Sequence, residues 1–555
     1  MEKCSPILGQ CDNAEAARHL AQFQPDLWGD TFLAFTLPPE ETENQRKDEV
    51  EVLKELVKKE LVANDKDPKE TLLYIDAIQR LGVAYHFEEE IQVILQKIFD
   101  YIQYDDSYNN DLHYVSLRFR ILREHGFRVS SDVFSKLKNE EGNLKDTYRS
   151  DVKGILSYYE ASQLKLHGEN EMDEALSYTS GLLSSFATDP NCCMASQVSH
   201  ALKLPLFKHT PRLESTYQIK LYESNPSRDD TLLNLAKLDF NLLQVLHIKE
   251  LQDITRWSES IGFSTKLPPF SRDRLVEAYF WTLGAYYEPK YSRARIILNK
   301  LFKIISITDD IYDAYGTFPE LQLFTDAIQR WDKSCGNLLP DYMKFFYEVV
   351  LDTFEEIEKE LANEGRSYAV NYLRKEMKAS CEAYMQEAKW CHEGYVPTFE
   401  EYMKNGIVSG GYYYLNAAAF TGMGEVANKD AFEWIQETTK AVKASCVLAR
   451  VVNDIGTRKF ERNRGHVASA VECYIRQFGV TQEEAHERLA LMAEDAWMDI
   501  KEDMLRPTTV PMPILTRVLN LSRALHDIYN VDEDGYTMNH FLKPKIEAIL
   551  VTPMI

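Results

Sequence analysis

The sequence predicts an all-α fold, and two observations support this prediction. The chain has 23 glycines and 20 prolines among 555 residues, fewer than the roughly 7% glycine and 5% proline of average proteins. A shortage of turn-forming residues favours long helices joined by short breaks. Apolar residues also recur with helical spacing, and no valine- and isoleucine-rich stretch alternates with a period of two. The clearest helical segments are 81–98, 345–362, 435–455 and 484–505.

A break in the helical pattern divides the chain into two predicted helical domains. Asn225-Pro226 disfavours helix, because proline restricts the residue before it, and the sequence SRDD at 227–230 can cap the next helix. The predicted domains cover residues 1–225 and 226–555. Further loops are expected at 262–274, which contains two prolines, and at 529–537, which is acidic.

The charge balance excludes several classes of partner. With 63 lysines and arginines against 87 acidic residues, the formal net charge is −24. A nucleic-acid-binding protein normally carries a basic stripe, and the same negative charge repels anionic lipid. We therefore expect no nucleic-acid partner and, since no apolar run is long enough to span a membrane either, no stable membrane insertion. An anionic substrate would need metal ions or a local arginine cluster to bind, because the overall field opposes it.

Cysteine usage and the first residues point to a cytoplasmic protein. The nine cysteines are scattered and form no CxxC pair, which favours a reducing compartment over a disulfide framework. The first 20 residues contain Glu2, Asp12 and Glu15 and no apolar core, unlike a signal or transit peptide. No apolar run approaches the roughly 18 residues of a membrane span.

Three aspartates form the sharpest local motif. Asp309, Asp310 and Asp313 follow an apolar run with no basic residue beside them. On a helix, Asp309 and Asp313 share a face, and Asp310 lies about 100° around it. Carboxylates packed among isoleucines would repel one another unless a cation joined them, and oxygen-only ligands suit Mg²⁺. The alternative is an acidic helix end exposed to water.

A second stripe of oxygen ligands is predicted nearer the C-terminus. Asn453, Thr457 and Glu461 are spaced four residues apart, so on a helix each is rotated only about 40° from the last. This arrangement could hold one more hard cation. The alternative is the polar face of an ordinary helix.

Arginines stand near both acidic motifs. Arg272 and Arg274 precede the aspartates, and Arg450 lies three residues before Asn453. Each could form an ordinary surface ion pair. In a chain of charge −24, however, arginines beside two metal stripes are suited to bind a polyphosphate. Together, the three motifs indicate a diphosphate site.

These motifs, RDR at 272–274, DDIYD at 309–313 and NDIGTRKFE at 453–461, resemble those of class I terpene synthases in order and spacing. The similarity runs along the whole chain and is closest to plant sesquiterpene synthases. It includes segments 73–91, 235–244, 272–281 and 464–474. The resemblance implies a non-catalytic N-terminal α-barrel and a C-terminal α-bundle that binds metal and carries out the chemistry.

The resemblance also implies the ligands of the site. Three Mg²⁺ ions are expected, and Mn²⁺ can replace them. Asp309 and Asp313 would bind two ions with support from Asp310, and Asn453, Thr457 and Glu461 would bind the third. The implied diphosphate-binding residues are Arg272, Arg274, Asp309, Asp313, Arg450 and Asn453. The metals and arginines would stabilise the leaving diphosphate, so that the allylic C–O bond breaks and leaves a carbocation.

Further residues match positions that handle the carbocation in this family. Trp281 corresponds to an aromatic pocket residue, with a core tryptophan as the alternative. Tyr529, Asp534 and Tyr536 correspond to a loop with deprotonation roles in some members, with a loop that they merely order as the alternative. The sequence 409–411 (SGG) matches a broken helix. At successive steps of 100°, only one or two of the three tyrosines after it can face the pocket.

The resemblance favours farnesyl diphosphate as the substrate and a monomeric sesquiterpene synthase. The chain lacks the DxDD motif of class II cyclases. Its Arg18-His19 and Trp28 replace the tandem-arginine element that accompanies many monoterpene cyclisations. The alternatives are a synthase that uses geranyl or geranylgeranyl diphosphate, a prenyl-chain elongase, and a non-catalytic helical relative. An elongase would normally carry two DDxxD motifs.

Overall fold

The prediction of an all-α fold is confirmed. The computed structural model describes residues 23–63, 67–101, 110–437, 439–464, 468–530 and 533–555. Within these ranges α-helices dominate, and the strands are two short ones, β1 (Tyr529–Asn530) and β2 (Glu533–Asp534). They pair antiparallel, with Tyr529 opposite Asp534, so the predicted acidic loop at 529–537 contains a small hairpin.

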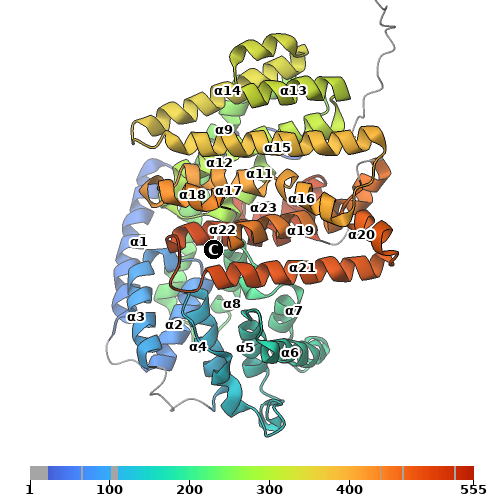
Figure 1. Cartoon of the computed structure of the whole chain (residues 1–555). Helices are drawn as coiled ribbons and strands as arrows, with labels where there is room; N and C mark the ends of the chain where they lie inside the picture. Colours follow the sequence, from blue (N-terminus) through green and yellow to red (C-terminus); the bar gives the residue numbers. More distant parts are fainter. Residues whose placement is uncertain (1–22, 64–66, 102–109, 438, 465–467, 531–532) are drawn as a thin grey trace, which may run out of the picture.

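Helices α1 to α8 form the N-terminal half, which Figure 1 shows in blue to teal in the lower part of the view. Their bounds are α1 Glu40–Leu61, α2 Pro68–Arg80, α3 Glu88–Tyr101, α4 Leu112–Glu124, α5 Val152–Ser162, α6 Asn170–Thr188, α7 Ala195–Lys203 and α8 Pro211–Glu223.

The long helix α9 (Asp230–Ile261) follows and packs against helices of both halves, α1 and α8 in the N-terminal half and α11 and α12 in the C-terminal half. It begins where the sequence predicted a new helix, because the Asp229 carboxylate accepts the backbone N–H of Thr231 at 2.8 Å. It ends at Gly262, whose φ of 81° lies in the left-handed region.

The remaining helices form the C-terminal half, with the yellow and orange ones in the upper part of Figure 1. Their bounds are α10 Phe263–Lys266, α11 Leu275–Ala285, α12 Ser292–Ala314, α13 Phe318–Arg330, α14 Asp341–Ala362, α15 Tyr368–Glu393, α16 Phe399–Ser409, α17 Tyr412–Thr421, α18 Lys429–Gln436, α19 Lys440–Arg464, α20 Ala470–Phe478, α21 Gln482–Asp503, α22 Met512–Ile528 and α23 Lys543–Leu550.

Two predicted helical segments begin or break differently in the structure. The segment 81–98 starts with a turn at Gly82, whose φ is 80°, so α3 begins only at Glu88. The segment 435–455 is divided between α18 and α19. A distant residue helps to fix the start of α19, because the backbone N–H of Ala441 donates to Asp503 of α21 at 2.7 Å.

None of the helices in the described ranges is both long enough and apolar enough to cross a membrane. A continuous hydrophobic cluster instead runs from Trp28 near the start of the described chain to Met554 near its end. The two halves therefore share buried apolar surface.

A buried ion pair ties the central helices together. The carboxylate of Glu250 in α9 accepts two hydrogen bonds from Arg295 in α12, both of 2.7 Å. It accepts a third, of 2.6 Å, from the Tyr279 hydroxyl in α11. The Glu250 and Arg295 side chains are 4% and 0% exposed. Loss of either partner would leave a buried charge without compensation.

We predict that Glu250→Ala lowers the free energy of unfolding by about 3–5 kcal/mol, because the Arg295 guanidinium loses its counter-ion in the interior. Chemical denaturation monitored by circular dichroism measures this change. The control is Glu259→Ala in an exposed position of the same helix, which should change stability by less than about 0.5 kcal/mol. Equal effects of the two substitutions would contradict the assigned role of the pair.

Candidate functional site

The predicted aspartates lie at the C-terminal end of α12. Asp310 is fully buried, whereas Asp309 and Asp313 are half-buried and line a cavity with it. This arrangement agrees with the sequence, which placed Asp309 and Asp313 on one face of the helix. Burial, followed by repulsion from Asp313, raises the pKa of Asp309. The carboxylates therefore lie where negative charge is unfavourable without a cation.

Arg272 supplies part of the missing positive charge. Its Nη2 donates to Asp309 Oδ2 at 2.6 Å, and its Nε lies 2.7 Å from Asp310 Oδ1. Its backbone N–H also donates to Asp310 Oδ2 at 2.7 Å, and Nη1 donates to the Thr537 hydroxyl at 3.2 Å. Burial raises the pKa of Asp310, although Arg272 acts against this rise. Arg272 is thus held against the aspartates in this structure.

Arg274 has a different environment from the one the sequence predicted. It is 1% exposed and is not among the residues that line the cavity. Its Nε donates to Tyr536 O at 2.8 Å, and its Nη2 donates to Gln24 O at 2.7 Å and to Thr537 O at 3.0 Å. The structure therefore does not bring Arg274 to the predicted diphosphate site. Arg274 instead ties the segment after the hairpin to the N-terminal segment.

The second predicted stripe lies on α19, and Arg450, Asn453 and Thr457 line the same cavity as the aspartates. The Arg450 guanidinium donates to Asn453 Oδ1 and forms an ion pair with Asp454. The Thr457 hydroxyl donates to the Asn453 carbonyl at 2.9 Å. Glu461 belongs to α19, but its side chain lies outside the described residues.

Asp454 is a site-supporting residue that sequence reasoning missed. It is fully buried, pairs with Arg450, and accepts the backbone N–H of Ala470 at 2.7 Å. It thereby joins α19 to the start of α20 and holds the arginine in place. Its position directly after Asn453 in the predicted motif was the available signal.

The two motifs face one cavity of about 1170 Å³, a volume that includes its open mouth. We call its charged and polar side chains the polar lining and its apolar and tyrosine side chains the aromatic lining. The polar lining comprises Arg272, Ser306, Asp309, Asp310, Asp313, Glu387, Ser409, Arg450, Asn453, Thr457, Asp534 and Thr537. The aromatic lining comprises Phe23, Trp281, Phe302, Ile305, Tyr384, Tyr402, Tyr412, Leu415, Ala449, Leu525, Tyr529 and Tyr536.

Trp281 of α11 lies at the centre of the aromatic lining. Its ring centroid is 5.1 Å from that of Phe302 and 5.9 Å from those of Tyr529 and Tyr536, which it meets edge to face. Its indole N–H donates to the Tyr412 hydroxyl at 3.2 Å. The tryptophan is thus both packed against other rings and in contact with the cavity.

The hairpin contributes Tyr529 and Asp534 to the cavity, and Tyr536, two residues after it, also lines the cavity. The Tyr536 hydroxyl donates to Ser306 Oγ at 2.9 Å. Asp534 Oδ1 accepts the backbone N–H groups of Tyr536 at 2.9 Å and Thr537 at 3.0 Å, so it orders the turn, as the alternative interpretation of the sequence suggested. Burial raises the pKa of Tyr529 and of Tyr536, which keeps both phenols protonated.

The helix break at 409–411 also borders the cavity. Helix α16 ends at Ser409, Gly411 adopts a φ of 74°, and α17 begins at Tyr412. Of the three consecutive tyrosines, Tyr412 lines the cavity, and Tyr413 and Tyr414 are not among its lining residues. This result agrees with the limit of one or two that the helical geometry set.

The start of the described chain covers part of the site. Phe23 lines the cavity, and its ring lies 4.9 Å from the Arg272 guanidinium. The Trp28 indole N–H donates to Glu277 of α11 at 3.1 Å. The predicted Arg18-His19 element lies outside the described residues.

The polar lining fits hard divalent cations. Its aspartate, asparagine and threonine side chains offer oxygen ligands on two helices that face one cavity, and burial opposes the negative charge of Asp309 and Asp310. Mg²⁺ binds through one or two carboxylates and completes its shell with water and phosphate oxygens. The chemistry that this arrangement supports is binding of an anionic group beside an apolar, aromatic pocket.

Comparisons with known proteins agree with this geometry. Residues 27–202 match the family "Terpene synthase, N-terminal domain", and residues 259–499 match "Terpene synthase family, metal binding domain". The chain is 48% identical to a probable sesquiterpene synthase of Santalum murrayanum, over 97% of this chain and 96% of the relative. It is 47% identical to a (−)-germacrene D synthase of Vitis vinifera, with the same coverage.

Solved structures are also similar. A limonene synthase with 2-fluorolinalyl diphosphate aligns with a TM-score of 0.92 and 30% identity, over 97% of this chain and 100% of that one. An isoprene synthase from grey poplar, Populus x canescens, in complex with three Mg²⁺ ions and dimethylallyl-S-thiolodiphosphate, aligns with a TM-score of 0.85 and 33% identity. That alignment covers 92% of this chain and 97% of that one.

We predict that Asp309→Asn raises the melting temperature of the metal-free protein at alkaline pH. Folding raises the pKa of Asp309, so its carboxylate costs stability as the pH rises above the ordinary value of 3.8. An amide has no such cost. In EDTA, the gain over the wild type should be smaller at about pH 5 than at about pH 8.

The matched control for this pH trend is Asp326→Asn, an exposed position on the neighbouring helix α13. Its melting temperature should follow that of the wild type at both pH values. A destabilised Asp309→Asn variant at alkaline pH would show that the attraction of Arg272 outweighs the burial and repulsion of this carboxylate.

Proposed function

Because the chain belongs to the terpene synthase family, we propose that it is a sesquiterpene synthase that converts farnesyl diphosphate into a C15 terpene and diphosphate. One observation carries this proposal. A single cavity joins oxygen ligands and arginines to a wall of aromatic side chains. The polar lining suits the diphosphate and the aromatic lining suits the hydrocarbon. Relatives that are 48% identical are named sesquiterpene synthases, which supports a C15 substrate.

The polar lining would hold Mg²⁺, or Mn²⁺ in its place. We assign Asp309 and Asp313 as ligands with Asp310 in support, and Asn453, Thr457 and Glu461 as the second ligand set. When bound, the metal ions supply positive charge that stabilises the leaving diphosphate. The three Mg²⁺ ions in the similar isoprene synthase complex support this assignment.

The arginines of the cavity would orient the diphosphate. The Arg450 guanidinium is held by Asp454, and that of Arg272 is held by Asp309 and Asp310. A guanidinium can donate two parallel hydrogen bonds to phosphate oxygens. We therefore assign Arg272 and Arg450 to the diphosphate, and Arg274 to the ordering of the segment beside them.

The aromatic lining would protect and stabilise the carbocation that remains after ionisation. The face of the Trp281 indole attracts positive charge, and the rings of Phe302, Tyr529 and Tyr536 around it exclude water that would quench the cation. Asp534 lines the same cavity, and its carboxylate is the group that would accept a proton lost from the cation.

We assign the chemistry to residues 226–555 and a supporting role to residues 1–225. Of the described residues that line the cavity, Phe23 alone comes from the N-terminal part. The described cysteines are free thiols, which supports a reducing compartment such as the cytoplasm. We expect the protein to act as a monomer.

Incubation with farnesyl, geranyl and geranylgeranyl diphosphate in separate reactions, each with Mg²⁺, tests this proposal. Gas chromatography–mass spectrometry of solvent extracts should detect a C15 hydrocarbon or alcohol from the farnesyl substrate, and none in excess EDTA. Activity mainly with another chain length would overturn the substrate assignment. No product from any substrate would favour a non-catalytic relative, and full activity in EDTA would refute the metal requirement.

We further predict that Asp309→Asn lowers turnover of farnesyl diphosphate by at least about 100-fold, because the charge that binds metal and stabilises the leaving group is lost. Steady-state assays at saturating Mg²⁺ measure this loss. Asp326→Asn should retain normal turnover. Near-normal activity of Asp309→Asn in a folded protein would exclude Asp309 as a metal ligand.

A further inference from the structure

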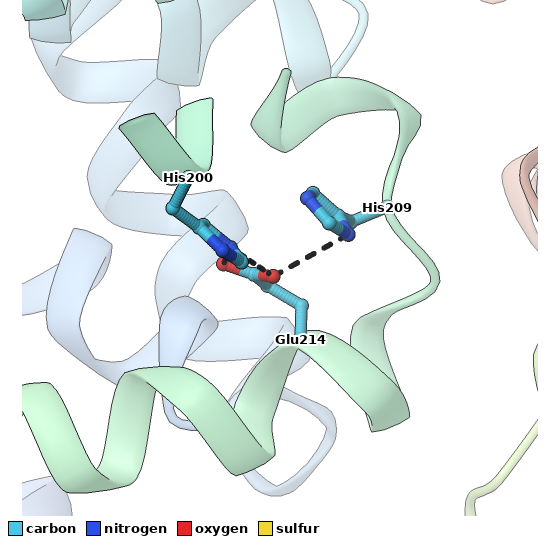
Figure 2. Close-up of side chains that lie close together, drawn as sticks. All are labelled: His200, His209 and Glu214. Carbon is cyan, nitrogen blue, oxygen red and sulfur yellow. Dashed lines mark hydrogen bonds and ion pairs between the residues drawn. The ribbon is translucent and has the colours of Figure 1, made fainter. Parts of the chain in front are cut away.

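Two histidines and a glutamate meet outside the proposed active site. His200 lies on α7, His209 follows the short 3₁₀ helix Leu206–Lys208, and Glu214 lies in the first turn of α8 (Figure 2). His200 Nε2 is 2.9 Å from Glu214 Oε2, and His209 Nδ1 is 3.4 Å from the same oxygen. None of the three lines the cavity described above. The terpene synthase chemistry therefore leaves this cluster unexplained.

His209 presents an acceptor nitrogen to the carboxylate. Its Nε2 lies 3.0 Å from the Leu204 carbonyl oxygen, a distance at which the ring nitrogen must donate its hydrogen. In the neutral ring Nδ1 then carries a lone pair, and this lone pair lies beside the Glu214 carboxylate. Among the described residues no hydrogen-bond partner is found for this buried atom. A lone pair that faces a carboxylate at 3.4 Å needs positive charge between the two groups, which either a metal ion or a second proton on the ring supplies.

We propose that His200, His209 and Glu214 form a Zn²⁺-binding site, with His200 Nε2, His209 Nδ1 and Glu214 Oε2 as ligands. Two histidines and one glutamate are a known donor set for Zn²⁺. Ligands at about 2.0–2.1 Å from a tetrahedral ion lie roughly 3.3 Å apart, close to the 2.9 and 3.4 Å measured here. The three donor atoms lie within 4.8 Å of one another.

Neighbouring groups already hold two of the ligands in orientation. The Leu204 carbonyl fixes the His209 tautomer, and Gln218 Nε2 donates to Glu214 Oε1 at 2.6 Å. Such outer contacts are typical of histidine-rich metal sites. The His200 and His209 rings are parallel within 6° and 5.0 Å apart, so one ring must turn to direct both nitrogens at one ion. His200 has the more exposed side chain of the two, at 28%, and turning it would break its stacking on Tyr217, whose ring centroid lies 3.8 Å away.

The site also has room for a further ligand. His209 and Glu214 line a second cavity of about 1540 Å³, a volume that includes its open mouth. A water molecule from this cavity can fill the fourth position of a tetrahedral ion. Bound Zn²⁺ would join three parts of the chain: α7 at His200, the segment between α7 and α8 at His209, and α8 at Glu214.

A second cluster among the described residues consists of His167, Asp499 and Glu502. Its carboxylates, unlike that of Glu214, already have a lysine as their partner. Lys440 lies 3.0 Å from Asp499 Oδ1 and also pairs with Glu502. Its ammonium group already supplies the positive charge between the carboxylates. This cluster therefore serves as the matched control.

Zinc content and thermal stability test the proposal. Untagged wild-type protein, His200→Gln, Glu214→Gln and the control His167→Gln are dialysed against Zn²⁺ with Mg²⁺ in excess, so that the oxygen-only site is occupied by Mg²⁺. Bound zinc is measured by inductively coupled plasma mass spectrometry. The melting temperature is measured by circular dichroism with and without Zn²⁺. Substitution of Co²⁺ adds a readout of coordination, because a tetrahedral site gives visible absorption.

We expect one more zinc per chain in the wild type and in His167→Gln than in His200→Gln, and a zinc-dependent rise in melting temperature only where this ion binds. Zinc affinity in His200→Gln should fall by about tenfold or more, since even outer contacts are worth that much. Equal zinc content and equal melting shifts in the wild type and a folded His200→Gln would overturn the proposal. A cluster held by a proton on His209 would give that result.

Discussion

The contact between Arg272 and the aspartates of α12 is the interaction on which the site depends. The Arg272 guanidinium contacts Asp309 and Asp310, and the Arg272 backbone N–H donates a further hydrogen bond to Asp310. It thereby places the segment before α11 against the end of α12. Without this cation, the buried carboxylates would repel one another. Under the proposed function, the same positive charge would bind the diphosphate once metal ions pair with the aspartates.

The same short segment also positions other walls of the cavity through hydrogen bonds to the residues after the hairpin. Arg272 also donates to Thr537 just after the hairpin, and Arg274 binds carbonyl groups of Tyr536 and Thr537. Tyr529 in the hairpin and Tyr536 just after it each lie 5.9 Å from Trp281, measured between ring centroids. One short segment of alternating charge, RDR at 272–274, therefore connects the polar lining to the aromatic lining.

Local patterns in the sequence predicted the all-α fold and put Asp309 with Asp313, and Asn453 with Thr457, on shared helical faces, because residues four apart share a face whatever the tertiary structure. They did not predict the starts of α3 and α19, which depend on a turn at Gly82 and on a contact with Asp503. The side-chain contacts of Arg274 could not be predicted. This residue lies where a loop meets the start of α11, and no helical or strand periodicity there indicates which way a side chain points. Phe302, Tyr384, Tyr402 and Leu525 come from four different helices and meet only through tertiary packing. For the same reason, no local sequence pattern indicated that His200 of α7 and Glu214 of α8 are in contact. The role of Glu461 as a metal ligand stays a prediction, because its side chain lies outside the described residues.

The account's central claim is that metal ions replace Arg272 as the partner of the α12 aspartates when diphosphate binds. A crystal structure of this protein with Mg²⁺ and an unreactive thiolodiphosphate analogue of the farnesyl substrate tests this claim most directly. We predict metal ions at Asp309, Asp313, Asn453, Thr457 and Glu461, with the Arg272 guanidinium turned from Asp309 to the diphosphate. A bound analogue without metal at these residues, or with Arg272 still paired to Asp309, would contradict the claim.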